Sequence, residues 1–165
     1  VQVAQARGAR AILIGRRPER LKLAEKVGAW QLINAQGTDT VAAVRALTEG
    51  RGADVAIVAC ASKQAQADAV YMVRKRGRVV LFGGLPKSDP ITQLDSNRIH
   101  YDELHIYGAF SYHPLYHKMA LDLIARGRVA AHKIVTATYP LERAVEAFAA
   151  ALSRSELKVV LITIE

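Results

Sequence analysis

Short apolar runs alternate with helix-like amphipathic runs along almost the whole chain, and this alternation constrains the fold more than any other feature. We predict strands at 11–14, 31–34, 55–59, 78–82, 105–109 and 158–164. Between the first two, Leu21, Ala24 and Val27 recur at helical spacing. Such alternation is typical of a parallel sheet with helices on both faces. The sequence therefore predicts an α/β, doubly wound fold with a mainly parallel sheet.

Composition restricts the class of protein further. With 165 residues, 51% of them hydrophobic and 23% charged, the chain is expected to form one ordinary domain with a sizeable core. No apolar run approaches the roughly 20 residues of a membrane span, and the opening VQVAQARGAR lacks the pattern of a signal peptide. Cys60 is the only cysteine, which excludes a disulfide within the chain. We expect a cytoplasmic protein with no membrane contact.

The first predicted strand ends at Gly15 and is followed by Arg16 and Arg17. In a nucleotide-binding βαβ unit, the residue at the end of the second strand faces the adenosine ribose. An acidic residue there accepts hydrogen bonds from a free 2′-hydroxyl, whereas Gly15 leaves room for a 2′-phosphate and the arginines supply positive charge. Arg20 adds a further cation in the first helical turn. The pattern predicts NADP rather than NAD.

Two simpler explanations of this positive charge remain open. The arginines could be a solvated helix start, although cations at a helix N-terminus oppose the helix dipole. The net charge of +8 could instead indicate a nucleic-acid partner. The basic residues are spread over predicted helices and loops, however, and form no recognised nucleic-acid motif. A phosphorylated cofactor explains part of the excess, so we expect no nucleic acid.

The phosphate-binding loop G-x-G-x-x-G is missing from the chain. The nearest string, GRGADV at 50–55, lies between a helix and a strand and is predicted to be a turn. The opening VQVAQARGA has the pattern of the second half of a helix that ends at Gly8. In the Rossmann strand order 3-2-1-4-5-6, loss of strand 1 leaves a gap between strands 2 and 4. We therefore interpret residues 1–165 as a dinucleotide-binding domain that is incomplete at its N-terminus.

Two further patterns suggest chemistry but are predicted to be structural. Tyr71 and Lys75 form Y-x-x-x-K, yet Val58 occupies the position of the serine that short-chain dehydrogenases need, so Tyr71 is expected to be buried on a helix at 65–74. His113 and His117 lack the glutamate of H-E-x-x-H, and His113 is expected to begin a helix at Pro114.

Cys60, at the end of an apolar strand, is expected to be a small packed residue rather than a reactive thiol.

Residues 83–103 form the longest irregular stretch and open at the carboxyl edge of the sheet, where ligands bind in such folds. Glycines 28, 77 and 127 are expected to end helices.

Six segments occur in an order and spacing that resemble a known family. They are AILIGRRPERLKLAEKVGA, GADVAIVACAS, RKRGRVVLFGGLP, IHYDELHIYGAFSYHP, YPLERAVEAFAAA and LKVVLI. Together they resemble the cofactor domain of the zinc-type medium-chain dehydrogenases. The fourth segment is most similar to the sorbitol, polyol and threonine dehydrogenase branch. The resemblance covers nearly all of the chain.

The resemblance implies a set of cofactor-binding residues that lie at strand ends. The ribose end is expected at Gly15, Arg16, Arg17 and Arg20, the adenine side at Ala59, Cys60 and Ala61, the nicotinamide ribose at Gly83, Gly84 and Leu85, the carboxamide at Ala109, Phe110 and Ser111, and the pyrophosphate at Lys158. No catalytic residue and no metal ligand is assigned within the chain.

The same resemblance implies hydride transfer between an alcohol or polyol and NADP(H). In such enzymes zinc polarises the alcohol oxygen. The zinc ligands are expected in a catalytic domain absent from this chain, which alone would be inactive. The family also implies a homo-oligomer, a dimer or tetramer. Two alternatives stay open: a zinc-free quinone or enoyl reductase of the same superfamily, and a non-catalytic nucleotide-sensing module.

Overall fold

The computed structural model describes residues 1–111 and 113–163. The chain divides into two compact units, one formed by Val1–Gly37 with His113–Glu165 and the other by Thr38–Tyr112. We call them unit 1 and unit 2 and describe each by itself. Ile164, the last residue of the predicted terminal strand, lies outside the described residues.

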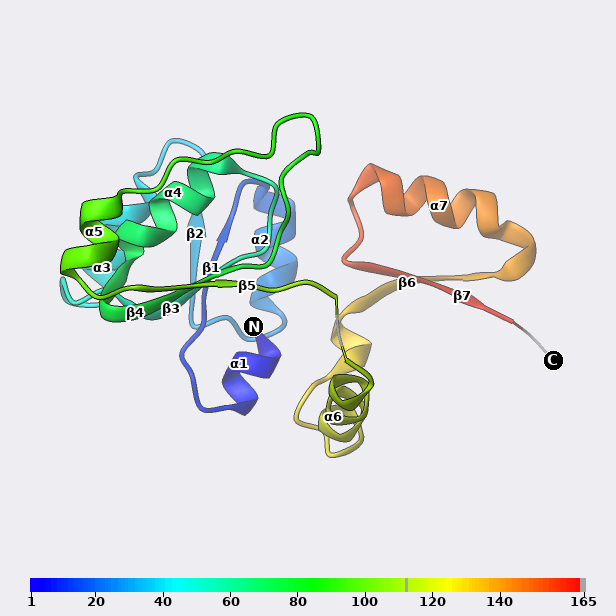
Figure 1. Ribbon diagram of the computed structural model, residues 1–165. Helices are drawn as coiled ribbons and strands as arrows, with labels where there is room; N and C mark the ends of the chain where they lie inside the picture. The colour runs from blue at the N-terminus through cyan, green and yellow to red at the C-terminus, as the bar shows by residue number, and fades with distance from the viewer. Residues whose placement is uncertain (112, 164–165) are drawn as a thin grey trace. The chain divides into compact units, whose positions relative to one another are not determined.

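The helices and strands alternate as the sequence predicts (Figure 1). In chain order they are α1 Gln2–Ala6, β1 Ile12–Gly15, α2 Pro18–Glu25, β2 Gln31–Asn34, α3 Thr40–Leu47, β3 Ala53–Val58, α4 Lys63–Met72, β4 Val73–Leu81, α5 Ser96–Tyr101, β5 His105–Gly108, α6 Pro114–Ala125, η1 Ala131–Lys133, β6 Val135–Pro140, η2 Leu141–Arg143, α7 Ala144–Ser153 and β7 Lys158–Ile162.

Unit 2 contains a parallel sheet in the order β3-β4-β5, on which α4 packs with α3 and α5 beside it (Figure 1). Its core joins α4 to the strands, and the side chains of Val70, Val73 and Val79 are fully buried. Helix α4 begins where the Ser62 hydroxyl accepts a hydrogen bond from the Ala65 amide at 3.2 Å. These contacts hold the carboxyl ends of three parallel strands side by side.

Unit 2 corrects two sequence-based expectations. Gly77 does not end a helix, because α4 ends at Met72 and Gly77 lies within β4. A Cβ at Gly77 would lie 2.6 Å from the Arg74 carbonyl oxygen, so close packing rather than helix termination requires glycine there. The irregular stretch 83–103 also contains a helix, α5, which the Asp95 side chain caps by accepting a hydrogen bond from the Arg98 amide at 2.9 Å.

In unit 1, the predicted strand 31–34 is confirmed residue for residue as β2, which pairs in parallel with β1. Helix α2 begins with Pro18 at its first positions and buries Leu21 and Ala24 against this pair. The glycines that follow α2 and α6 adopt positive φ, +83° at Gly28 and +67° at Gly127, as the predicted helix ends require.

The terminal strand does not join the other strands in one sheet. It pairs in parallel with β6, a strand that the sequence analysis missed, and α7 connects the two. Among the described residues the strands thus pair as β1-β2, β3-β4-β5 and β6-β7. In the same part of the chain β1 pairs only with β2, and β3 only with β4.

None of the described helices combines the length and the apolar character needed to cross a membrane.

Candidate functional site

The carboxyl end of β1 carries the arginines that the sequence analysis placed at the ribose. The Gly15 carbonyl accepts a hydrogen bond from the Ala35 amide at 2.8 Å, which fixes the strand end. Arg16 and Arg17 are exposed, and Arg17 is the N-cap of α2 without a capping hydrogen bond from its side chain. Arg20 is half-buried in the first turn of α2.

Packing supplies a second reason for glycine at position 15, which sequence reasoning missed. A Cβ there would lie 2.9 Å from Cδ2 and 3.3 Å from Cγ of Leu21. Leu21 is buried, with 8% of its surface exposed, so it has little freedom to move. Gly15 therefore allows α2 to approach the strand closely, in addition to leaving space at the strand end.

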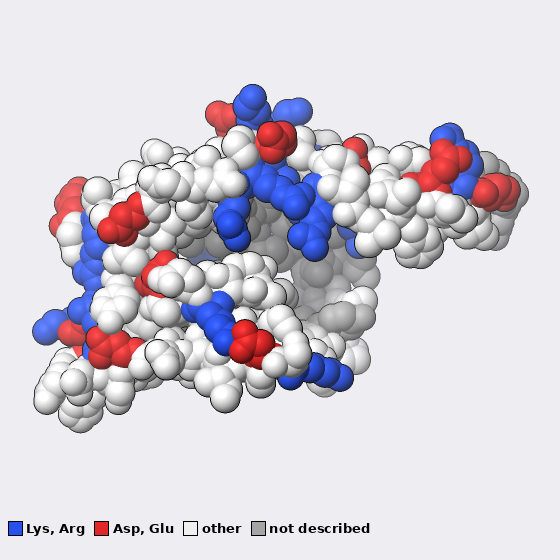
Figure 2. Space-filling model, turned by 90° about the horizontal axis from the view of Figure 1, so that it is seen from above, with Lys and Arg blue, Asp and Glu red and all other residues white. Residues whose placement is uncertain are grey.

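Within residues 1–111 and 113–163, Arg16, Arg17 and Arg20 make no hydrogen bond or ion pair through their side chains. Figure 2 shows lysine and arginine side chains gathered near the middle and at the left edge of the upper face, with acidic side chains beside many of them. In the part of the chain that the structure describes, the three arginines at the end of β1 have no such carboxylate partner. Guanidinium groups without a carboxylate partner are available to form charge-assisted hydrogen bonds to a phosphate.

A cavity of about 250 Å³ in unit 1 brings two of the predicted site residues together. Arg20 lines it from α2 and Lys158 lines it from the start of β7. The other lining residues are Ala151, Arg154, Glu156, Leu157 and Val159. The sequence analysis assigned Arg20 and Lys158 to different phosphates and did not identify Arg154, because no local pattern relates a residue after α7 to α2.

In unit 2, the predicted residues of the adenine, nicotinamide-ribose and carboxamide segments lie at the carboxyl ends of adjacent strands. The Gly83 amide donates a hydrogen bond to the Val58 carbonyl at 2.7 Å, and the Ala109 amide donates to the Leu81 carbonyl at 3.1 Å. Segments 59–61, 83–85 and 109–111 therefore leave the sheet next to one another. Their role as a site stays a prediction.

The turn after β4 approaches the turn after β3 so closely that only glycine fits. A Cβ at Gly83 would lie 2.6 Å from the Cys60 nitrogen and 2.7 Å from its carbonyl oxygen. Gln66, buried on α4, donates a hydrogen bond from Nε2 to the Gly83 carbonyl oxygen at 3.3 Å. Sequence reasoning missed Gln66, although a lone glutamine on the apolar face of a helix is a detectable signal. At Gly84, by contrast, a Cβ would meet nothing within 4 Å.

Two expectations about burial in unit 2 are wrong. Tyr71 is 40% exposed, because its hydroxyl reaches the surface and donates a hydrogen bond to Asp95 Oδ2 at 2.7 Å. This hydrogen bond to a carboxylate raises the pKa of Tyr71. Cys60 is exposed rather than packed, because β3 already ends at Val58 and leaves Cys60 in the turn.

The described residues do not fit a zinc site. His113 is the N-cap of α6, and its Nδ1 accepts a hydrogen bond from the Leu115 amide at 3.2 Å, which confirms its predicted position at a helix start. Three or more His, Cys, Asp or Glu side chains that could share a metal ion are not found anywhere in 1–111 or 113–163.

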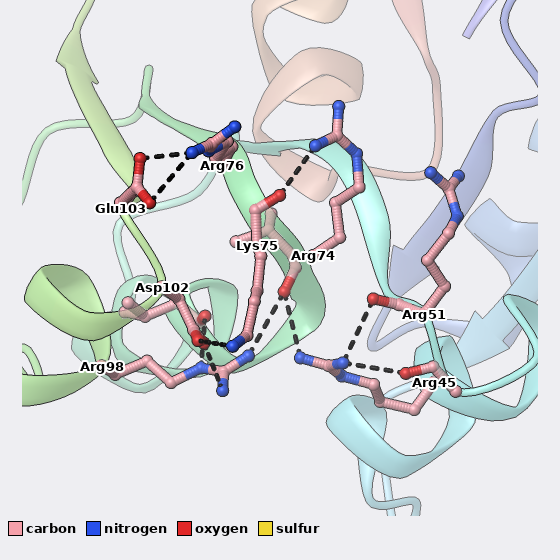
Figure 3. A network of polar contacts seen from close by, with 11 residues as sticks. Arg45, Arg51, Arg74, Lys75, Arg76, Arg98, Asp102 and Glu103 are labelled. Carbon is pink, nitrogen blue, oxygen red and sulfur yellow. Dashed lines mark hydrogen bonds and ion pairs between the residues drawn. The ribbon is translucent and has the colours of Figure 1, made fainter.

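A second group of basic residues, in unit 2, forms hydrogen bonds and ion pairs with carbonyl and carboxylate oxygens of the same unit (Figure 3). Arg45 and Arg98 approach the same carbonyl oxygen, that of Val73, at 3.0 and 3.4 Å. Arg98 Nη1 also lies 2.5 Å from Oδ2 of the buried Asp102. This cluster surrounds the amino end of β4, opposite to the carboxyl ends of β3, β4 and β5, and we interpret it as structural.

Asp54 at the start of β3 belongs to the same charged region. It pairs with Arg51 at 3.0 Å and with Arg74 at 2.6 Å. Hydrogen bonds from these two guanidinium groups lower the pKa of Asp54 to about 2. Its carboxylate is therefore ionised at every physiological pH and neutralises part of the local charge.

Comparison with known proteins gives the same result for fold and family. The family model described as zinc-binding dehydrogenase matches residues 1–126. The sorbitol dehydrogenase of Bacillus subtilis (strain 168) is 34% identical over 153 residues, which cover 92% of this chain and 42% of that protein.

Two solved structures show the likeness in three dimensions. Alcohol dehydrogenase TADH from Thermus sp. ATN1 superposes with a TM-score of 0.88 at 32% identity, over 99% of this chain and 46% of that one. A putative zinc-binding dehydrogenase from Sinorhizobium meliloti 1021, bound to NADP, superposes with a TM-score of 0.85 at 27% identity, over 98% and 48% respectively. The predicted α/β fold and the predicted family are confirmed, and the chain spans less than half of each of these proteins.

Proposed function

Because the chain belongs to the zinc-binding dehydrogenase family, we propose that it supplies the NADP-binding part of an enzyme that transfers hydride between an alcohol or polyol and NADP(H). The observation that carries this proposal is a set of three arginines at the carboxyl end of β1, next to a glycine, that have no carboxylate partner among the described residues. The NADP bound to the Sinorhizobium meliloti relative and the sorbitol substrate named for the Bacillus subtilis relative support it.

Each group of residues has a distinct part in this proposal. Arg16 and Arg17 bind the 2′-phosphate through charge-assisted hydrogen bonds, which are stronger than neutral ones. The backbone of the turn after β4 meets the nicotinamide ribose, and Gly83 keeps that turn close to Cys60. The bound nicotinamide supplies or accepts the hydride. Ala109, Phe110 and Ser111 then orient the carboxamide, and Ala59 and Ala61 border the adenine.

The remaining parts of the proposal concern the whole protein. We propose that residues 1–165 are an incomplete dinucleotide-binding domain, since β1 and β3 each lack a second neighbouring strand among the described residues. Zinc and its ligands would then be supplied from outside this chain, because the described residues hold no ligand set for it. The whole protein is proposed to be a cytoplasmic homo-oligomer that acts on small alcohols or polyols.

The cofactor assignment is tested with Arg16→Ala in the full-length natural protein. Loss of a charged hydrogen-bond partner of the 2′-phosphate should lower kcat/KM for NADP about 10- to 150-fold. The value for NAD should change little, because NAD has no 2′-phosphate. The measurement is the change in NADPH or NADH absorbance with a panel of polyols.

Arg126→Ala is the matched control, because Arg126 is also an exposed arginine of unit 1 but lies at the end of α6. It should leave the ratio of the two cofactors unchanged. Equal losses with NADP and NAD for Arg16→Ala would show that Arg16 has a structural role. Turnover of quinones but of no alcohol or polyol would contradict the proposed substrate class.

A further inference from the structure

Arg154 lies in the turn between α7 and β7 and lines the same cavity as Arg20 and Lys158. Its backbone adopts the left-handed conformation, with φ 59° and ψ 20°. This conformation ends α7 and turns the chain toward β7, so that the residues on both sides of the turn, Ala151 and Leu157, line the cavity too. Three cations from three different segments thus border one small space.

The charges around this space are unbalanced. Arg20, Arg154 and Lys158 contribute three positive charges, and Glu156 is the single acidic residue of the lining. Within the described chain none of the three cations forms an ion pair, with Glu156 or with any other carboxylate. Like charges that converge without a counter-ion repel one another, so the arrangement favours binding of an anion.

The size of the space limits which anion fits. Pockets for whole drug-sized ligands measure about 300–1,000 Å³. A cavity of about 250 Å³ is smaller than that range but large enough for a phosphate group. Guanidinium and ammonium groups together offer the donors that phosphate oxygens accept.

We propose that Arg154 is a cofactor-binding residue, and that Arg20, Arg154 and Lys158 together bind a phosphate group of the dinucleotide. This inference rests on the proposed function, because the anion it identifies belongs to that cofactor. Arg154 thereby links the turn after α7 to cofactor affinity, a role that neither its neighbours in sequence nor its secondary structure indicates.

A purely structural role for Arg154 makes a different prediction. A cation near a helix C-terminus interacts favourably with the helix dipole. Replacement by glycine keeps the left-handed backbone, which glycine adopts without steric cost, and removes only the side chain. Arg154→Gly therefore separates loss of the guanidinium group from disruption of the turn.

The test measures the dissociation constants of NADP+ and NAD+ for Arg154→Gly and Arg154→Gln in the full-length natural protein. We expect binding to weaken about tenfold, the loss typical of one hydrogen bond to a charged group. Weakening with both cofactors identifies the pyrophosphate as the bound group, and weakening with NADP+ alone identifies the 2′-phosphate. Glu156→Gln should strengthen binding, and Arg126→Gln, which removes an equal charge elsewhere in unit 1, should have no effect.

Unchanged affinity for both cofactors in the two Arg154 variants would overturn the inference, as would a fall in melting temperature without loss of affinity. If the unmodified protein binds neither cofactor, the proposed function fails, and titration with inorganic pyrophosphate then tests the cavity alone. Pyrophosphate binding that Arg154→Gly weakens would support an anion site there. Pyrophosphate binding that is absent or insensitive to Arg154 would overturn it.

Discussion

The arginines at the carboxyl end of β1 differ from those around the amino end of β4 in whether their side chains have partners within the described chain. Every arginine labelled in Figure 3 has a hydrogen bond or ion pair with a carbonyl or carboxylate group. Arg16, Arg17 and Arg20 have none among the described residues. A net charge of +8 therefore does not show where positive charge is available to a ligand.

The difference has a local cause. Asp54, Asp102 and Glu103 lie close to the ends of β3 and β5 where the arginines of the cluster converge. The segment that follows β1 offers only Glu19 in the first turn of α2, and Glu19 forms no ion pair with the described residues.

Arg45→Ala should destabilise the protein without altering cofactor preference. The Arg45 guanidinium donates to the carbonyl oxygens of Tyr71 at 2.7 Å, Val73 at 3.0 Å and Gly50 at 2.9 Å. Its loss leaves the Tyr71 and Gly50 carbonyls without this charged donor, while Arg98 still approaches the Val73 carbonyl, and should lower the free energy of unfolding by about 1.5–3 kcal/mol. Arg45→Lys should recover only part of this, because an ammonium group lacks the planar fork. Chemical denaturation measures the free energy of unfolding of both variants. A change in the ratio of NADP to NAD activity would contradict the structural role of Arg45.

Arg17→Asp should raise the free energy of unfolding and weaken NADP binding. Arg17 has the extended backbone of an N-cap, φ −111° and ψ 115°, but no capping side chain. Aspartate there can accept hydrogen bonds from the first amides of α2 and should raise the free energy of unfolding by about 1 kcal/mol. It should also weaken NADP binding, because a carboxylate repels the 2′-phosphate.

Arg17→Asn is the control, since asparagine caps equally well without a charge. It should stabilise α2 to a similar extent and weaken NADP binding less. Thermal unfolding and cofactor titration test the pair. If Arg17→Asp binds NADP as tightly as the unmodified protein, Arg17 is not at the phosphate.

Lowering the pH should remove the stabilisation that Asp54 contributes through its ion pairs with Arg51 and Arg74. The pKa of Asp54 is about 2 in the folded protein, below its usual value of 3.8, so the folded state holds fewer protons than the unfolded state between these values. The contribution of Asp54 is therefore complete above pH 3.8 and is lost as the pH falls toward 2. Its side chain is 53% exposed, so the contribution is less than about 1 kcal/mol after solvent screening.

Asp54→Asn isolates this effect. The difference in unfolding free energy between the unmodified protein and Asp54→Asn should shrink as the pH is lowered from neutral to about 2, and high salt should reduce it at every pH. A difference that does not depend on pH would show that the ion pairs with Arg51 and Arg74 contribute nothing to stability.

Much of the fold was predictable because its signals are local. Pro18 marks the start of α2, Gly28 and Gly127 mark helix ends, and the run QLIN forms β2 with the predicted bounds. Strand β6 was missed although its run VTATYP has the period-2 alternation and the β-branched and aromatic residues typical of a strand, and only the proline at its end weakens that signal.

The candidate site was predictable only in part. The arginines after β1 and the glycines after β4 carry a sequence signal, since both follow apolar strands. The exposure of Cys60 and the approach of Arg154 to Arg20 and Lys158 do not, because each depends on residues distant in the chain. The burial of Gln66 has a local signal, but its partner, the Gly83 carbonyl, lies far along the chain.

The sequence alone indicated the alternation of strands and helices, the bounds of β2, the start of α2, the glycines that follow α2 and α6, and the positive charge after β1. Periodicity, caps and turn residues act over a few residues, so they can be recognised in the chain alone. Only the tertiary structure decided which arginines are neutralised, why Gly83 cannot carry a side chain, and that β7 pairs with β6. These outcomes depend on close packing and charge pairing between segments far apart in sequence, which no local pattern encodes.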